Sequence, residues 1–195
     1  MRRIGILGDI GSGKSYIAKS FGYPVFNADE EVAKIYKKDK KVFFKLKKIL
    51  PKYINSYPIN KDQISNAILT NKSNLKKIIK IVHFVVRKKM NLFLKKNKNK
   101  KVVILDIPLL LENKINKKND ILIFIYANKK KILKKLKKRK NFNIKLFSIF
   151  KKIQLPLDYK KKKSNFTIKN NFTKKGVKRD INIILTKILK WKKLY

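Results

Sequence analysis

The sequence predicts an α/β fold in which a parallel sheet carries helices on both faces. Short apolar runs alternate with amphipathic helical patterns, a glycine-rich loop separates the first such pair, and a purely helical stretch interrupts the alternation. At 195 residues and 44% hydrophobic content, the chain has the size and composition of a single globular domain. We therefore expect a folded chain with a substantial core.

The first elements are short and closely spaced. Residues 3–7 form an apolar run that predicts a strand, and a helical pattern follows from Lys14. Residues 24–26 predict a second strand that ends near Asn27, and another helical pattern comes directly after it.

The middle of the chain predicts helices only. Amphipathic patterns cover residues 42–50 and 61–69, and a longer pattern begins near Asn74. In this last pattern, apolar residues recur at spacings of three, four and seven, which places them on one helix face. We expect a helical insertion here.

Alternation resumes in the second half. Residues 102–105, followed by Asp106, form an apolar, β-branched run typical of a buried parallel strand, and residues 121–126 predict another strand. A lysine-rich helix with an apolar stripe follows at residues 129–139.

The C-terminal part contains a segment with weak structural signals. Residues 140–163 are lysine-rich, with few punctuating residues besides Pro156, and we expect a mobile cover there. Residues 166–168 predict a last strand, and apolar residues from Val177 to Trp191 predict a C-terminal helix. The expected parts are a core of about residues 1–29 and 101–195, a helical insertion of about 30–100, and a lid of about 140–163.

The strongest chemical signal is the segment Gly8–Ser15, which reads GDIGSGKS and matches GxxxxGK[ST] between a predicted strand and helix. Glycines let consecutive backbone N–H groups face a phosphate, Lys14 reaches the β and γ phosphates, and the Ser15 hydroxyl ligates Mg²⁺. The alternative is a glycine-rich turn with a solvated lysine. The flanking strand and helix favour the phosphate-binding loop, or P-loop.

Two acidic residues follow predicted strands, in a chain with only 11 Asp and Glu residues. Asp29 comes just after the second strand and Asp106 ends the third, and carboxyl ends of parallel strands form the ligand crevice of such sheets. A carboxylate there holds a metal or its waters, or orients an acceptor hydroxyl and takes its proton. The alternative for both residues is helix capping, and Asp29 before Glu30 and Glu31 suits an N-cap.

His83 is the only histidine, and Arg87 follows it four residues later on the same predicted helix face. Arginine is scarce in this lysine-rich chain, so Arg87 and Arg139 suggest bidentate phosphate or carboxylate contacts. A packing role for His83 and a solvated helix end for Arg139 are the alternatives.

Together these segments resemble the dephospho-CoA kinases of the P-loop kinase superfamily over nearly the whole chain. Besides the P-loop, Phe26–Asp29 resembles the family's D-A-D, His83–Arg87 resembles H-P-x-x-R, and Asp106–Glu112 resembles D-x-P-L-L-F-E. Gln154-Leu155-Pro156 is similar to Q-x-P of the lid, and Ile168-Lys169-Asn170 to I-D-N near the last strand.

The resemblance implies transfer of the ATP γ-phosphate, with Mg²⁺, to the ribose 3′-hydroxyl of dephospho-CoA, the last step of coenzyme A synthesis. It implies Asp29 as the base and, with Lys14, as a catalytic residue; His83, Arg87 and Asp106 join Asp29 at the acceptor. Ser15 is the implied metal ligand. The implied ATP-binding residues are Gly11, Ser12, Gly13, Lys14, Ser15, Tyr16 and Arg139.

The sequence departs from the family pattern at several positions. Asn27 replaces the first acid of D-A-D, Phe84 stands in place of a proline, and Tyr16 in place of a threonine. Lys135 and Phe150 occupy positions that are usually arginine, and lysine keeps the charge but loses the planar fork of guanidinium.

The charge balance is strongly basic, with 54 Lys and Arg residues and a net charge of +43. Such a charge suits nucleic acid or an acidic membrane, but only five of these residues are arginine and the lysines extend over the whole chain. We therefore favour codon drift in an AT-rich genome, with no specific nucleic-acid partner and only non-specific polyanion binding.

The sequence lacks cysteine, which excludes disulfides and thiolate sites, and it contains no apolar run of membrane-spanning length. We expect a cytoplasmic protein without a membrane partner; its oligomeric state is left open. Two further functions stay open: a P-loop kinase for a nucleoside monophosphate or another small alcohol, and a charge-driven nucleic-acid-binding protein.

Overall fold

The computed structural model describes residues 1–139 and 142–190, and it divides the chain into two compact units. The sheet unit comprises Met1–Phe26, Asn99–Phe142 and the chain from Gln154 onward. The helical unit comprises Asn27–Lys98 and Asn143–Ile153. Each unit is described by itself below.

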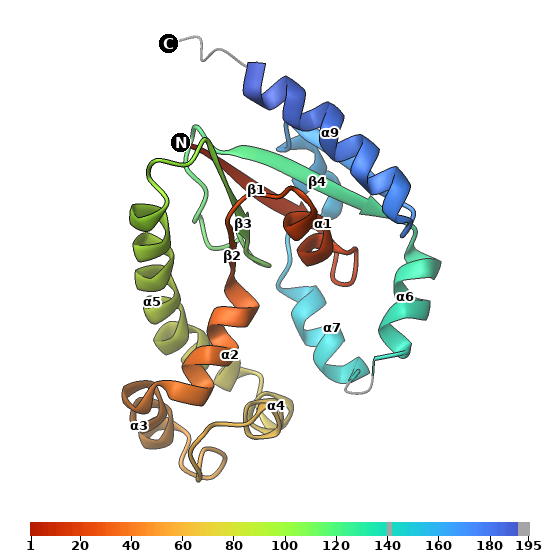
Figure 1. The fold of residues 1–195 in the computed structure, drawn as a ribbon. Coiled ribbons are helices and arrows are strands. Elements are labelled where there is room, and N and C mark those ends of the chain that lie inside the picture. Colours follow the sequence, from red (N-terminus) through yellow and green to blue (C-terminus); the bar gives the residue numbers. More distant parts are fainter. Residues whose placement is uncertain (140–141, 191–195) are drawn as a thin grey trace. The chain divides into compact units, whose positions relative to one another are not determined.

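A five-stranded sheet with the strand order β2-β3-β1-β4-β5 forms the centre of the sheet unit (Figure 1). Strand β1 pairs in parallel with β3 and β4, with Ile4 opposite both Ile104 and Ile121, and β4 pairs in parallel with β5. The predicted parallel sheet is therefore confirmed. The strands are β1 (Arg2–Gly8), β2 (Val25–Asn27), β3 (Val102–Asp106), β4 (Ile121–Ala127) and β5 (Phe166–Asn170).

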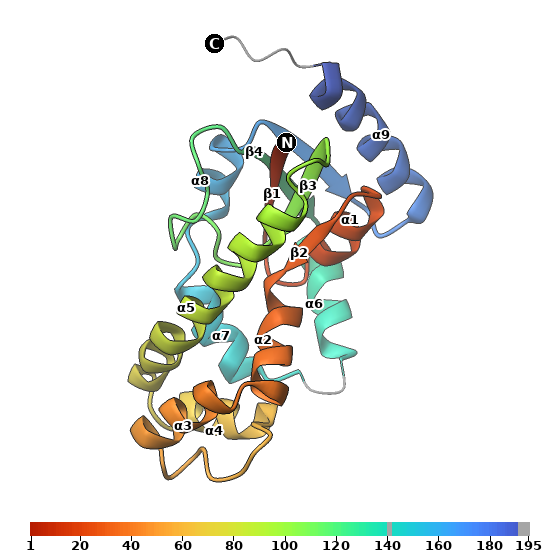
Figure 2. The same ribbon diagram turned by 60° about the vertical axis from the view of Figure 1, so that its left-hand side comes forward.

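Helices cover both faces of this sheet, as predicted. On one face, apolar residues of the strands, such as Ile4, Ile6 and Ile123, share a core with α1 and α9 (Figure 1). On the other face, α8 packs against β1 (Figure 2), and Leu110 and Leu122 lie close to Gly5. The helices of this unit are α1 (Lys14–Ser20), α6 (Lys129–Lys137), α8 (Leu157–Lys162) and α9 (Lys174–Lys190).

The helical unit contains the predicted insertion together with a later helix. Helix α5 contacts α2, α3 and α4, while α7 contacts α4. Apolar residues such as Leu46, Ile54 and Val82 are buried within the unit. The helices are α2 (Ala28–Lys38), α3 (Lys40–Ile49), α4 (Lys61–Thr70), α5 (Ser73–Lys96) and α7 (Ile144–Lys152).

Two helices lie where the sequence shows weak signals. Helix α7 begins after Asn143, whose side chain accepts a hydrogen bond from the N–H of Leu146 at 3.0 Å, and α8 begins after Pro156. The segment expected as a lid, about 140–163, thus contributes to both units. Its residues 140–141 lie outside the described residues.

Helix α9 matches the predicted C-terminal helix as far as Lys190. Trp191, which the apolar pattern includes, lies outside the described residues. Among the helices that the structure describes, none is long and apolar enough to cross a membrane.

Candidate functional site

The P-loop connects β1 to α1 and has a backbone conformation that requires glycine. Gly11 and Gly13 have φ angles of 80° and 91°, which L side chains rarely adopt. A Cβ atom on Gly13 would lie 2.4 Å from Nδ2 of Asn170, so the space beside the loop also excludes a side chain. The loop that the sequence predicted is therefore present as a closely packed backbone turn.

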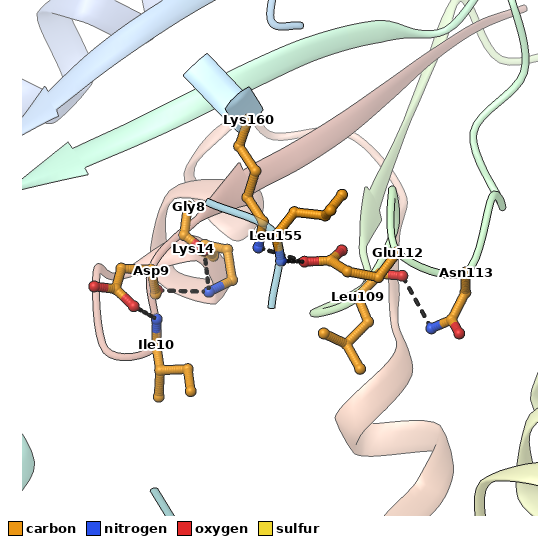
Figure 3. Close-up of polar contacts among 9 residues, drawn as sticks. All are labelled: Gly8, Asp9, Ile10, Lys14, Leu109, Glu112, Asn113, Leu155 and Lys160. Atoms are coloured by element: carbon orange, nitrogen blue, oxygen red, sulfur yellow. Dashed lines mark hydrogen bonds and ion pairs between the residues drawn. The ribbon is translucent and has the colours of Figure 1, made fainter. Parts of the chain in front are cut away.

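Polar contacts inside the loop place Lys14 against its own backbone (Figure 3). The Lys14 ammonium donates to the carbonyl oxygen of Asp9 at 2.7 Å and of Gly8 at 3.3 Å. Ser12 Oγ is buried without a hydrogen-bond partner in the described part of the chain, while Ser15 and Tyr16 are exposed. The Lys14 ammonium thus lies beside the loop that would hold phosphates.

A cavity of about 610 Å³ lies in the sheet unit, between α6 and the turn after β5. Among the residues that the structure describes, its lining carries several cations and no carboxylate, and it includes the predicted residue Arg139. The lining residues are Lys131, Lys134, Lys135, Lys138, Arg139, Asn171 and Phe172. Helix α6 also contacts the P-loop region, because a Cβ on Gly11 would lie 3.0 Å from both Ile132 and Leu136.

Asp106 ends β3 and is 3% exposed, which places its carboxylate at the carboxyl edge of the sheet.

Glu112, in the segment that follows β3, forms a buried ion pair with Lys160 (Figure 3). Glu112 Oε1 lies 2.7 Å from Nζ of Lys160 and accepts a hydrogen bond from the N–H of Leu155 at 3.0 Å. These contacts connect the chain after β3 to the start of α8.

A family model described as dephospho-CoA kinase matches residues 2–175. The chain belongs to the dephospho-CoA kinase family. A dephospho-CoA kinase from Wolbachia sp. subsp. Brugia malayi (strain TRS) is 34% identical over 187 residues, covering 93% of this chain and 95% of that protein. The family consists of kinases, which are transferases, and the resemblance noted from the motifs is confirmed.

Solved structures share the fold of this family member. The crystal structure of TT1252 from Thermus thermophilus has a TM-score of 0.74 at 22% identity, covering 96% of this chain and 97% of that one. Dephospho-CoA kinase from Campylobacter jejuni has a TM-score of 0.64 at 22% identity, with the same coverage of 96% and 97%.

The family's D-A-D segment lies at the start of the helical unit, where Asn27 caps α2. The Asn27 side chain accepts a hydrogen bond from the N–H of Glu30 at 2.9 Å. Asp29 lies two residues after the N-cap position, and its exposed side chain belongs to the first turn of α2. The capping alternative for Asp29 is therefore wrong, because the departure at Asn27 supplies the cap.

The H-P-x-x-R segment of the family lies on α5 in the helical unit. His83 is half-buried and Arg87 is exposed one turn later. Burial and, secondarily, the positive charge of Arg87 lower the pKa of His83 from its ordinary value. The imidazole is therefore biased toward its neutral form.

The structure places three of the residues that depart from the family pattern. Lys135 places its ammonium 4.4 Å from the ring centroid of Phe172, as a cation–π pair beside the cavity. Phe84 is 56% exposed, with Lys88 Nζ 4.5 Å from its ring centroid, and α5 continues as a helix through this position. Phe150 lies on α7 in the helical unit.

Sequence reasoning missed several residues of the sheet unit. Asn171 and Phe172 line the cavity. Lys160 is 1% exposed, although no spacing in the sequence distinguishes it from the other lysines. In the sequence, Asn170 stands out only as the last residue of the family-like segment Ile168-Lys169-Asn170. A φ angle of 67° at Phe172 marks a turn that a sequence pattern does not reveal.

The described residues contain no cluster of three or more His, Cys, Asp or Glu side chains suited to a metal ion. Mg²⁺ does not need such a cluster, because it commonly keeps several waters and is bound through few protein ligands and substrate phosphates. The chemistry of the P-loop, with the exposed hydroxyl of Ser15 after Lys14, fits this mode of binding.

Proposed function

We propose that this chain transfers the γ-phosphate of ATP to the ribose 3′-hydroxyl of dephospho-CoA. The observation that carries the proposal is a P-loop beside a cation-lined cavity of about 610 Å³, within a chain that belongs to the dephospho-CoA kinase family. A loop for phosphates next to a large cavity suits a nucleoside triphosphate.

In this proposal the sheet unit binds ATP. The backbone of Gly11, Ser12 and Gly13 surrounds the phosphates, and Lys14 neutralises charge on the β and γ phosphates. The nucleoside part occupies the cavity, where Arg139 and the ring of Phe172 contact it. Tyr16, exposed after Ser15 on α1, stays an ATP-binding candidate.

Ser15 is the proposed protein ligand of Mg²⁺, which offsets negative charge on the phosphates when it is bound. The other ligands would come from phosphate oxygens and water. The proposed protein contribution is thus one hydroxyl group on the first turn of α1.

Three of the four proposed acceptor-binding residues, Asp29, His83 and Arg87, belong to the helical unit, and the fourth, Asp106, belongs to the sheet unit. His83 and Arg87 hold dephospho-CoA, and the insertion of about 30–100 is its binding region. The segment of about 140–163 is the proposed lid. As the 3′-hydroxyl oxygen bonds to the γ-phosphorus, the bond from that phosphorus to the β–γ bridging oxygen breaks and ADP leaves. The Asp29 carboxylate takes the hydroxyl proton. Asp106 also binds dephospho-CoA in this proposal.

The test is incubation of the purified protein with Mg·ATP and dephospho-CoA, beside a panel of nucleoside monophosphates, with products identified by mass. We expect phosphate on dephospho-CoA only. Asp29→Asn should lower kcat by about 10²- to 10⁴-fold, because an amide cannot accept the proton.

Asp62→Asn is the matched control, since Asp62 is also an exposed aspartate in the first turn of a helix of the same unit. This variant should keep full activity. Phosphate on a nucleotide alone would overturn the acceptor, and no transfer by folded protein would overturn the proposed function.

A further inference from the structure

The side chain of Asn170 joins two parts of the sheet unit that are far apart in sequence. Its Nδ2 donates to the carbonyl oxygen of Ser12 in the P-loop at 2.8 Å, and its Oδ1 accepts from the N–H of Phe172 at 2.8 Å. Asn170 is 3% exposed, and its hydrogen bond to Ser12 is buried, while the one to Phe172 is partly buried. One buried amide thus bridges the P-loop and the turn that lines the cavity.

The P-loop backbone packs closely against the side-chain amide of Asn170. A Cβ on Gly13 would lie 2.4 Å from Asn170 Nδ2 and 3.8 Å from Cε1 of Phe172. The backbone of Gly13 is therefore packed closely against the Asn170 amide, and the Phe172 ring lies just beyond it. A displacement of Asn170 would move the P-loop, the Phe172 turn, or both.

On its other side, the turn forms one wall of the cavity. Phe172 has a φ angle of 67°, a conformation that a phenylalanine adopts only when its surroundings hold it there. The N–H of Phe172 bonds to Asn170, and its ring lies 4.4 Å from Nζ of Lys135. The hydrogen bond to Asn170 is thus one of the contacts that hold Phe172 in this turn.

We propose that Asn170 is a positioning residue that sets the spacing between the phosphate site and the nucleoside cavity. The proposal rests on the proposed function, because it takes the cavity as the site of the nucleoside part of ATP. A ligand with two joined parts gains affinity from both subsites only if the protein holds them at the matching separation. Asn170 should therefore matter more for whole ATP than for its parts.

The test compares the dissociation constants of ATP, adenosine and inorganic tripolyphosphate, measured by competition with a fluorescent nucleotide. The product of the adenosine and tripolyphosphate constants, divided by the ATP constant, measures how well the two subsites cooperate. We expect Asn170→Ala to lower this ratio by about tenfold. A role limited to overall stability would leave the ratio unchanged.

Asn165→Ala is the matched control, because Asn165 Oδ1 accepts a hydrogen bond from the N–H of Leu122 at 2.8 Å just before the same strand, away from the cavity lining. Its ratio should equal that of the wild type. If Asn170→Ala fails to fold, Asn170→Ser keeps a polar group at the buried position and is judged by the same ratio.

A ratio that falls by less than about threefold in the Asn170 variant overturns the inference, whatever happens to the separate constants. The proposed function would be overturned by a different result. A wild-type protein that binds ATP but transfers nothing to dephospho-CoA would overturn the function, whereas an active wild type with an unchanged ratio in the variant overturns only the role of Asn170.

Discussion

Lys160 and Glu112 form an ion pair of 2.7 Å whose side chains are only 1% and 10% exposed. The same carboxylate oxygen accepts the N–H of Leu155. Lys160→Met would leave a buried carboxylate without its cation, and we expect the free energy of unfolding to fall by about 3–5 kcal/mol in urea titrations. Adding Glu112→Gln should recover part of this loss, because the uncompensated charge disappears.

The pair of Lys34 and Glu31 on α2 serves as the control, since its 2.6 Å contact involves a lysine side chain that is 60% exposed. Lys34→Met should change the free energy of unfolding by less than about 1 kcal/mol, because solvent screens this pair. Equal losses in Lys160→Met and Lys34→Met would contradict the buried-pair argument.

Lys14→Met should lower kcat for phosphoryl transfer by about 10²- to 10³-fold, because it removes a positive charge from the phosphate site. Its ammonium donates to the carbonyl oxygens of Gly8 and Asp9, so a thermal melting curve is needed to show that the variant is folded. Steady-state kinetics beside a melting curve measures both. Lys101→Met, on an exposed lysine before β3, should keep its activity; an active Lys14→Met protein would refute the role of Lys14.

Arg139→Ala should raise the KM for ATP several-fold at low salt and leave the KM for dephospho-CoA unchanged, because Arg139 lines the cavity. The side chain is exposed, so added salt should screen its charge and reduce the difference from the wild type. Kinetics at two ionic strengths tests this expectation. Lys137→Ala is the control, since this exposed lysine of α6 is not part of the cavity lining. Equal effects of both variants would favour general electrostatics.

Stability should depend on pH through His83. Because burial and Arg87 lower its pKa in the folded protein, the unfolded chain binds a proton first as the pH falls below about 6.5. The folded state should therefore lose stability from about pH 6.5 down to the lowered pKa, with no further loss from this residue below it. Urea titrations of wild type and His83→Gln between pH 5 and 8 compare the slopes, and parallel curves would contradict the prediction.

Much of the fold was predictable because its signals are local. Apolar runs identified β1 and β3, and three- and four-residue spacings identified α5. Helices α7 and α8 were missed because α7 has no fully buried residue and α8 has only six residues. Their stability comes from neighbours that the local pattern does not contain.

In the candidate site, too, some residues are recognisable from short segments of sequence, whereas others become recognisable only after folding. A run of glycines before Lys14 specifies its own backbone turn, so the P-loop is recognisable in eight consecutive residues. The bridge from Asn170 to Ser12 joins residues 158 positions apart, and only folding places them within 2.8 Å. Lys160 resembles other lysines in the sequence, and it becomes distinctive only when burial brings it to Glu112. Positive φ angles and apolar periodicity are properties of short segments, whereas burial and pairing depend on residues from the whole chain.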